Sequence, residues 1–185
     1  MQYPGGLRAR YRWAGTRSAE AVFSTSEASG ALTDYGALEG AEPDQLCRAE
    51  LRVEGPLGAW TARLASLIYD EPQGVLWDGA GLLLVKYGFR AYAFHARSGD
   101  LAWSHAEPTP VVAVLASPRL DHCLAQSELH TTALRADGEV AWRAVHNEVV
   151  TDAQLVGGRL ILASYGGQHV VLDAASGQPA AVDGS

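Results

Sequence analysis

The chain has few cysteines and almost no lysine. Its 185 residues include two cysteines, Cys47 and Cys123, and a single lysine, Lys86. The cysteines are 76 positions apart, so they form neither a C-x-x-C motif nor the dense disulfide framework of a small secreted domain, although one disulfide between them stays open. Because the other 13 basic residues are arginines, the shortage of lysine indicates coding bias before it indicates a function.

Long apolar runs and a basic excess are absent too. No segment approaches the roughly 18 apolar residues of a membrane-spanning helix, and the N-terminus, MQYPGGLRARYRW, has no apolar secretory signal. The net charge of −7 repels phosphate backbones and anionic membranes. We therefore expect a cytoplasmic protein that binds neither membranes nor nucleic acid as its main activity, and whose acidic surface favours a basic partner.

No catalytic or metal-binding motif stands out. The chain has no G-x-S-x-G nucleophile motif and no glycine-rich phosphate loop followed by a helix and a lysine. His122 and His130 lie eight residues apart, near Asp121 and Cys123, without the short spacing of a zinc site. The sequence therefore predicts no enzymatic activity, no cofactor and no metal ion.

What the chain does have is an internal repeat. Leu82–Gly99 aligns without a gap with a later segment, Leu160–Gly177. Chance similarity of two apolar strands would not also preserve both turns, so the repeat determines the fold prediction. The identical pairs are Leu82/Leu160, Leu84/Leu162, Tyr87/Tyr165, Gly88/Gly166, Ala96/Ala174, Ser98/Ser176 and Gly99/Gly177.

Two further copies give the period. Gly138 lies midway between Gly99 and Gly177, and the interval from Trp103 to Trp142 equals the interval from Gly99 to Gly138. A weaker upstream copy runs over Leu51–Gly55 and is followed by Trp60. A period of roughly 40 residues is typical of repeat architectures such as β-propellers.

Each unit divides into four short apolar strands separated by glycine turns. In the last unit the expected strands are Val149–Leu155, Leu160–Tyr165, His169–Asp173 and a short Pro179–Val182. This spacing leaves no room for crossover helices. We predict an all-β, β-propeller-like array of about four 39-residue, four-stranded antiparallel blades, arranged as a small ring or an open arc. Because unpaired blade edges invite another chain, an arc also predicts a homodimer or docking onto a larger partner.

The repeat resembles the PQQ-like repeat of quinoprotein-type β-propellers over roughly residues 49–182. The shared features are the apolar strands, the Tyr-Gly turn, the D-A-x-S-G turn and a tryptophan four residues past the glycine. The last unit has Asp173, Ser176 and Gly177 but Ala181 in place of the tryptophan. An aspartate can accept bonds from amides in the turn, the glycine allows positive φ, and the tryptophan should cover the seam to the next blade.

The resemblance does not extend to the quinone enzymes' site. Those enzymes use acidic and amide metal ligands, a tryptophan stacked below the cofactor and often adjacent cysteines. The two cysteines here are not adjacent, and no acid and amide set occupies matching positions in the repeats. The resemblance therefore implies the fold without the cofactor.

Residues 1–48 break the repeat, whereas residues 49–185 form the repeat region; together we expect a single domain. The first part contains possible strands at Leu7–Trp13 and Ala19–Ser24, then a Ser/Gly/Ala-rich stretch, Thr25–Asp44, that is typical of a long loop. Leu7–Trp13 could supply the strand that completes the last blade, whose fourth strand is weak.

Comparison of the units with one another separates two edges. If the first strand is innermost, the 1–2 and 3–4 turns share one edge and are uniform, whereas the 2–3 turns and inter-blade links share the other and are varied. Varied aromatic and charged loops suit recognition, although loops can also vary through lack of constraint. The candidate partner-binding residues are Lys86, Tyr87, Phe89, Arg90, His105, Glu128, His130, His146, Tyr165 and Gln168.

The leading functional hypothesis is a non-enzymatic interaction module that binds another protein through the varied edge. One alternative is a small-molecule or glycan-binding propeller, or an enzyme, with a site at the central opening. Another is an accessory or immunity-type subunit of a larger bacterial assembly.

Overall fold

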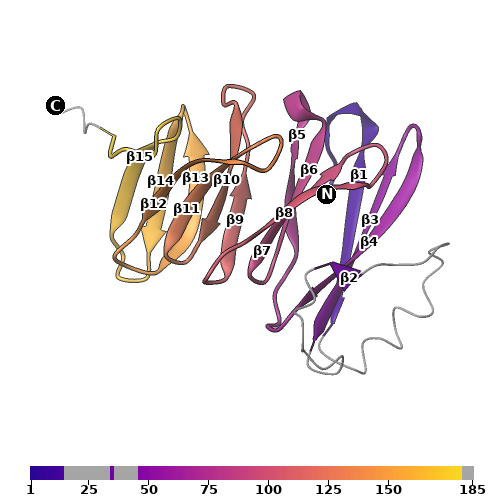
Figure 1. Ribbon diagram of the computed structural model, residues 1–185, viewed down its shortest axis with the longest axis horizontal. Coiled ribbons are helices and arrows are strands. Elements are labelled where there is room, and N and C mark those ends of the chain that lie inside the picture. The colour runs from indigo at the N-terminus through magenta and orange to yellow at the C-terminus, as the bar shows by residue number, and fades with distance from the viewer. Residues whose placement is uncertain (15–33, 36–45, 181–185) are drawn as a thin grey trace.

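The computed structural model describes residues 1–14, 34–35 and 46–180, and it consists of short β-sheets standing side by side in a row (Figure 1). The described part contains no α-helix and has 3-10 turns at η1 (Pro4–Gly6) and η3 (Asp78–Ala80). Apart from the short β2, strands of five to nine residues alternate with turns that often contain glycine, which favours hairpins over helices. The predicted all-β array is confirmed.

The four sheets follow one another along the chain. The first blade has the order β1 (Arg8–Ala14), β3 (Cys47–Gly55), β4 (Gly58–Ser66), β2 (Asp34–Tyr35); the second is β5 (Gln73–Trp77), β6 (Leu82–Tyr87), β7 (Arg90–His95), β8 (Leu101–Ala106). The third is β9 (Val111–Leu115), β10 (His122–Ser127), β11 (His130–Arg135), β12 (Val140–Val145), and the fourth is β13 (Val150–Val156), β14 (Arg159–Ser164), β15 (His169–Asp173). A lone bridge between Leu172 and Pro179 stands where a fourth strand of the last blade would pair.

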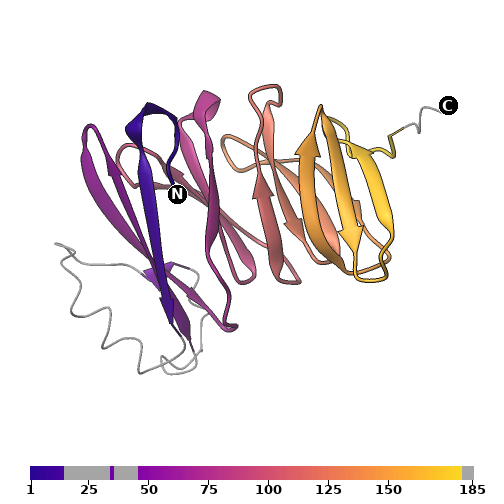
Figure 2. The same cartoon turned by 180° about the vertical axis from the view of Figure 1, so that it is seen from behind.

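The blades form an open arc. Each buried cluster joins neighbouring blades only: first with second, second with third, and third with fourth. Figures 1 and 2 show the first and fourth blades at opposite ends of the row. Of the two arrangements that the repeat allowed, the structure therefore has the arc.

Strand alternation supplies the seams. On β6, Leu83 and Val85 pack toward the first blade, whereas Leu82 and Leu84 pack toward the third. A β-strand that is buried on both faces needs apolar residues at every position, which explains the run LLLV. Full burial of each such side chain contributes about 1.5–3 kcal/mol.

A tryptophan closes each seam, as predicted. Trp60 lies against Gly99 of the next blade and Trp103 against Gly138, and a Cβ atom added at these glycines would lie 2.5 Å and 2.8 Å from the indoles. The indole N–H of Trp60 donates to the Ala96 carbonyl at 3.0 Å, and the indole N–H of Trp103 donates to the Ala136 carbonyl at 3.1 Å. Both glycines also have positive φ, so a side chain is disfavoured there by the backbone conformation as well as by the overlap with the indole.

The third seam uses the same geometry with a different hydrogen bond. Trp142 lies against Gly177, and His122 stacks edge-on against Trp142 with 5.8 Å between ring centroids. His122 Nε2 lies 2.9 Å from the Ala174 carbonyl oxygen, the acceptor that corresponds to those of Trp60 and Trp103. His122 is therefore a packing residue of this seam.

The N-terminal region supplies a strand of the first blade, so the prediction that Leu7–Trp13 completes the last one is wrong. β1 pairs antiparallel with β3, and Ala9 and Tyr11 pack with Leu51 and Val53 in the core shared with the second blade. This register is favoured because both strands bury their alternate apolar residues on the same side.

Other expectations for this region are tested only in part. Asp34–Tyr35 forms the short strand β2, parallel to β4, inside the stretch expected to be a loop. The expected strand at residues 19–24 and the rest of residues 25–44 lie outside the described residues.

Cys47 and Cys123 are both buried and free, so they do not form a disulfide.

Candidate functional site

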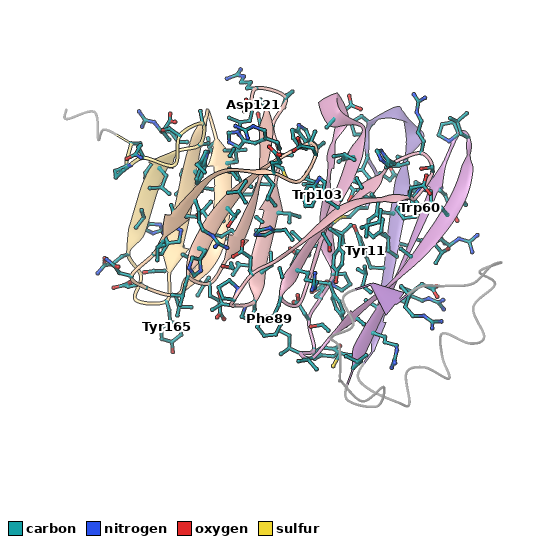
Figure 3. The ribbon with its side chains drawn as sticks, in the orientation of Figure 1. Tyr11, Trp60, Phe89, Trp103, Asp121 and Tyr165 are labelled. Atoms are coloured by element: carbon teal, nitrogen blue, oxygen red, sulfur yellow. The ribbon has the colours of Figure 1, made fainter. Side chains whose placement is uncertain are left out.

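The candidate site is the edge of the array that carries the 2–3 turns and the inter-blade links, here called the loop edge. It comprises residues 67–72, 88–89, 107–110, 128–129, 146–149 and 165–168. Phe89 and Tyr165 lie on this edge and Asp121 lies on the opposite one (Figure 3). The strand order agrees with the two edges expected from the sequence.

The backbone of the loop edge is tied together by a repeated pattern. The carbonyl oxygens of Gly88 and Phe89 accept hydrogen bonds from the amides of Val111 and Glu107, both at 2.8 Å. In the third blade the carbonyls of Glu128 and Leu129 accept from the amides of Val150 and His146, at 2.7 and 2.8 Å. Each turn is thereby fixed to the link that follows it, and the edge is ordered before any partner arrives.

Lys86 belongs to this framework and not to its surface. Its side chain is 8% exposed, and Nζ donates to Asp70 Oδ1 at 2.8 Å. The other carboxylate oxygen of Asp70 accepts from the amide of Gly88 at 2.8 Å. Tyr87 is 1% exposed and packs in the core between the first two blades. The expectation that Lys86 and Tyr87 contact a partner is therefore corrected: both side chains are buried.

Glu107 forms a second tie, between the second and third blades. Its carboxylate is fully buried, with one oxygen 2.9 Å from Arg143 Nη2 and the other 3.2 Å from His105 Nε2. Burial alone would raise the pKa of Glu107, but bonding to His105 and Thr132 and the charge of Arg143 outweigh burial and lower it. His105 is thus committed to this buried carboxylate.

The side chain of His146 is held in a similar way. His146 Nε2 lies 2.7 Å from the Thr131 hydroxyl, which donates to the Gln126 side chain. Burial, together with the nearby His130, lowers the pKa of His146, which favours the neutral ring. Within the described ranges, no group of three His, Cys, Asp or Glu side chains converges to hold a metal ion.

Tyr165 is the most exposed large hydrophobic residue of the described part of the edge, at 86%. The ungapped alignment equates it with the buried Tyr87, and the structure corrects this. In the second blade Tyr87 pairs directly with Arg90 across a two-residue turn, whereas in the fourth blade the pairing shifts by one and a longer turn closes Ser164 against Gln168. The shift moves Tyr165 out of the strand and onto the tip of the turn.

The remaining candidates are accessible to different degrees. Gln168 is exposed, and Phe89, Arg90, Glu128 and His130 are half-buried. Arg90 Nη1 donates to the Ser104 hydroxyl at 3.3 Å.

Sequence reasoning missed further apolar residues of the edge. In the link between the first and second blades Leu67 is 44% exposed and Tyr69 is 64% exposed, and near the fourth blade Val145 and Val149 are 69% and 40% exposed. The available signal was the segment LIY between two strands, because a connecting loop rarely needs large apolar residues.

A cavity of about 490 Å³ lies between the third and fourth blades, with Ser164, the residue before Tyr165, in its lining. It is lined in part by His146, Glu148, Gln168 and Val170. Glu148 Oε2 accepts from the Ser164 hydroxyl at 2.6 Å, which fixes one wall. The site thus combines exposed aromatics, a hollow and rigid walls.

The expected alternative location at a central opening has no enclosed axis to occupy, because the described sheets do not close a ring. A second cavity, of about 660 Å³, lies instead on the opposite edge between the first two blades, with Pro56, Trp60, Leu76 and His95 in its lining.

Comparison with solved structures defines the class: the chain has a β-propeller-type fold. BamB from Moraxella catarrhalis matches with 16% identity and a TM-score of 0.52, over 78% of this chain and 49% of BamB. The computationally designed Ika4 protein matches with 11% identity and a TM-score of 0.54, over 77% and 96%. The dihydro-heme d1 dehydrogenase NirN matches with 15% identity and a TM-score of 0.55, over 75% and 34%.

The chain spans about half the length of BamB and of the WD40 domain of Doa1. No protein-family model matches the sequence, and no curated protein matches it. No helix in the described ranges is long and apolar enough to cross a membrane.

Proposed function

We propose that the chain is a non-enzymatic, cytoplasmic interaction module that binds a partner protein through the loop edge. The observation that carries the proposal is Tyr165, an aromatic side chain 86% exposed at the tip of a turn whose backbone is fixed to its neighbours. Tyr69 and Phe89 extend the same edge toward the first blade. Aromatic anchors on a rigid surface are what protein interfaces use most.

Rigidity supports this use. The turns are bonded to the links, and two ion pairs hold the links in place: the buried Lys86 with Asp70, and the buried Glu107 with Arg143. A partner therefore meets a preformed surface, and little conformational entropy is lost in ordering it.

The cavity between the third and fourth blades suggests how the partner engages. Its walls include Glu148. Elsewhere on the edge Glu71 and Glu128 add negative charge, whereas Arg90, which follows Phe89, is a half-buried cation. A partner segment with an apolar side chain for the cavity and basic residues around it fits this chemistry, in keeping with the net charge of −7.

The type of repeat can be assigned from the seams and the turns. We assign the repeat to the PQQ-like type, because the seam tryptophans and the Asp173 turn follow that pattern: Asp173 accepts from the amides of Ala175 and Ser176 at 3.1 and 2.9 Å. One structural neighbour is a chain of the mitotic checkpoint complex, which agrees with a role in an assembly. Two alternatives to a free-standing module follow from the open arc: the chain could be an accessory subunit of a larger assembly, or it could form a homodimer through the blade edges.

A second candidate function rests on the 660 Å³ cavity. Its lining of proline, leucine and tryptophan suits an apolar small molecule, with His95, Asp78 and Arg97 available for polar groups. Thermal-shift screening separates the two: stabilisation by an apolar ligand that is lost in Trp60→Ala and retained in Tyr165→Ala favours the cavity.

The experiment for the leading proposal is a partner capture with matched variants. Tyr69→Ser, Phe89→Ser and Tyr165→Ser together should abolish capture of a partner that the unmodified chain retains, with the melting temperature nearly unchanged. Val140→Ser with Val156→Ser is the control, because both residues are exposed and lie outside the loop edge. Capture that survives the triple substitution rejects the loop edge as the binding surface.

A further inference from the structure

The outer face of the first blade carries a row of arginines. Ala9, Leu51 and Val53 face the core, so the alternate residues of β1 and β3 face away from the array. On β1 these are Arg8, Arg10 and Arg12, all exposed; on β3 the same face carries Arg52, with 41% of its side chain exposed, together with Glu54 and the buried Arg48 and Glu50. A chain of net charge −7 thus presents a local positive surface at one end.

The charges of this row are only partly balanced. Arg12 pairs with Glu50, and Arg52 with Glu54 at 3.2 Å, whereas Arg8 and Arg10 form no ion pair with the described residues. Arg10 also lies directly opposite Arg52 in the register. Like charges directly opposite each other destabilise a sheet, and an external anion beside Arg10 would relieve this repulsion.

The same strand has an incompletely paired edge. Trp60 of β4 takes the role that Trp103 has on the fourth strand β8, so β4, β3 and β1 correspond to the fourth, third and second strands of a blade. Only Met1–Tyr3 occupies the place of the first strand: Met1 and Ala9 exchange backbone bonds at 2.8 and 3.0 Å. Beyond Ala9, no strand among the described residues pairs with this edge.

The backbone of β1 is therefore set to accept another strand. Ala9 directs its N–H and C=O to the free edge, and in an antiparallel ladder the residue two positions on, Tyr11, does the same. Residues of an added strand beside Arg10 and Arg12 would lie on the arginine face. The residues between them would face the second blade, where the Tyr3 hydroxyl bonds the Gly74 carbonyl at 3.0 Å.

We propose that β1 binds an extended acidic segment of a partner protein, which adds as a strand along Arg10–Ala14 and places alternate carboxylates against the arginine row. Backbone bonds supply affinity in this mode, and alternate side chains supply specificity. The surface is distinct from the loop edge and has the opposite charge preference, so one array can hold two partners or two segments of one partner.

The test measures, by fluorescence anisotropy, how tightly the full chain binds a short labelled peptide of alternating glutamate and threonine. Controls are a peptide of the same composition with the glutamates in one block, an alternating lysine and threonine peptide, and oligo-dT. The alternating acidic peptide should bind most tightly, and Arg8→Gln with Arg10→Gln should weaken binding by about tenfold or more. Arg97→Gln with Arg119→Gln, exposed arginines elsewhere, removes the same charge and should leave it unchanged.

Amide hydrogen exchange separates strand addition from loose charge attraction. Peptide binding should slow exchange at the Tyr11 amide, and the arginine variants should lose this protection while keeping the same melting temperature. Equal affinity for the blocked peptide, tighter binding of oligo-dT, or no change at the Tyr11 amide would each overturn the proposal.

Discussion

The seam between the second and third blades allows a quantitative test by way of Gly138. Substitution by alanine forces a side chain onto φ +88° and places its Cβ atom 2.8 Å from the indole of Trp103. The positive φ costs about 1–2 kcal/mol and the overlap about 1–3 kcal/mol, so Gly138→Ala should lower the free energy of unfolding by about 2–5 kcal/mol.

Trp103 is the partner in this test. The side chain is half-buried and its N–H bonds the Ala136 carbonyl at 3.1 Å. Trp103→Ala should cost about 2–4 kcal/mol, roughly half of a fully buried aromatic truncation plus one hydrogen bond.

The double variant separates strain from contact. Trp103→Ala removes the ring atoms at 2.8 and 3.1 Å from that Cβ but keeps the Cβ of residue 103 at 2.9 Å, so the combined loss should be smaller than the sum of the single losses by about 1 kcal/mol. Urea unfolding followed by circular dichroism measures all four proteins. Strictly additive losses would refute the account, because they would mean that the ring of Trp103 does not restrict a side chain at position 138.

The buried pairs, the titrating groups and the exposed tyrosine of the loop edge can each be tested. Lys86→Met leaves the Asp70 carboxylate without its buried cation and should destabilise the fold by about 2–4 kcal/mol in urea unfolding, and Asp70→Asn combined with it should recover part of the loss. The pKa of Glu107 is lowered in the folded state, so its contribution to stability is present above the unfolded pKa and disappears as pH falls through the folded pKa. The pKa of His146 is also lowered in the folded state. The free energy of unfolding should therefore decrease as pH falls below about 6.5, the pKa of an unfolded histidine. Glu107→Gln should flatten the acidic part of this profile and His146→Gln the part near neutrality, and an unchanged profile in either variant contradicts its assignment. Tyr165→Ala should change the unfolding free energy by less than about 0.5 kcal/mol, since the side chain is 86% exposed, and a larger loss would mean that it has a structural role.

The sequence predicted the parts of the fold that repeat. The equal spacing of the seam tryptophans Trp103 and Trp142 and of their glycines indicated the blades and the seams, because the same local packing recurs in each unit. Whether the array closes depends on contacts between its first and last sheets, which no local pattern encodes.

The candidate site was predicted less completely, and for physical reasons. An ungapped alignment cannot show a one-residue change of strand pairing, so Tyr87 and Tyr165 looked equivalent although one is buried and the other is 86% exposed. Lys86 looked like a surface charge because its partner, Asp70, lies on a different segment. The alternation of Arg8, Arg10 and Arg12 was visible in the sequence, but only the pairing of β1 with β3 shows that these residues share one exposed face.

Site-specific photo-crosslinking tests the central claim most directly, namely that the loop edge is the binding surface. A photoreactive phenylalanine analogue is introduced at Tyr69 or at Tyr165 on the loop edge, and at Asp137 on the opposite edge as an exposed control. The account predicts covalent products with one partner protein from positions 69 and 165, and none with it from position 137. Products from position 137 alone would contradict it.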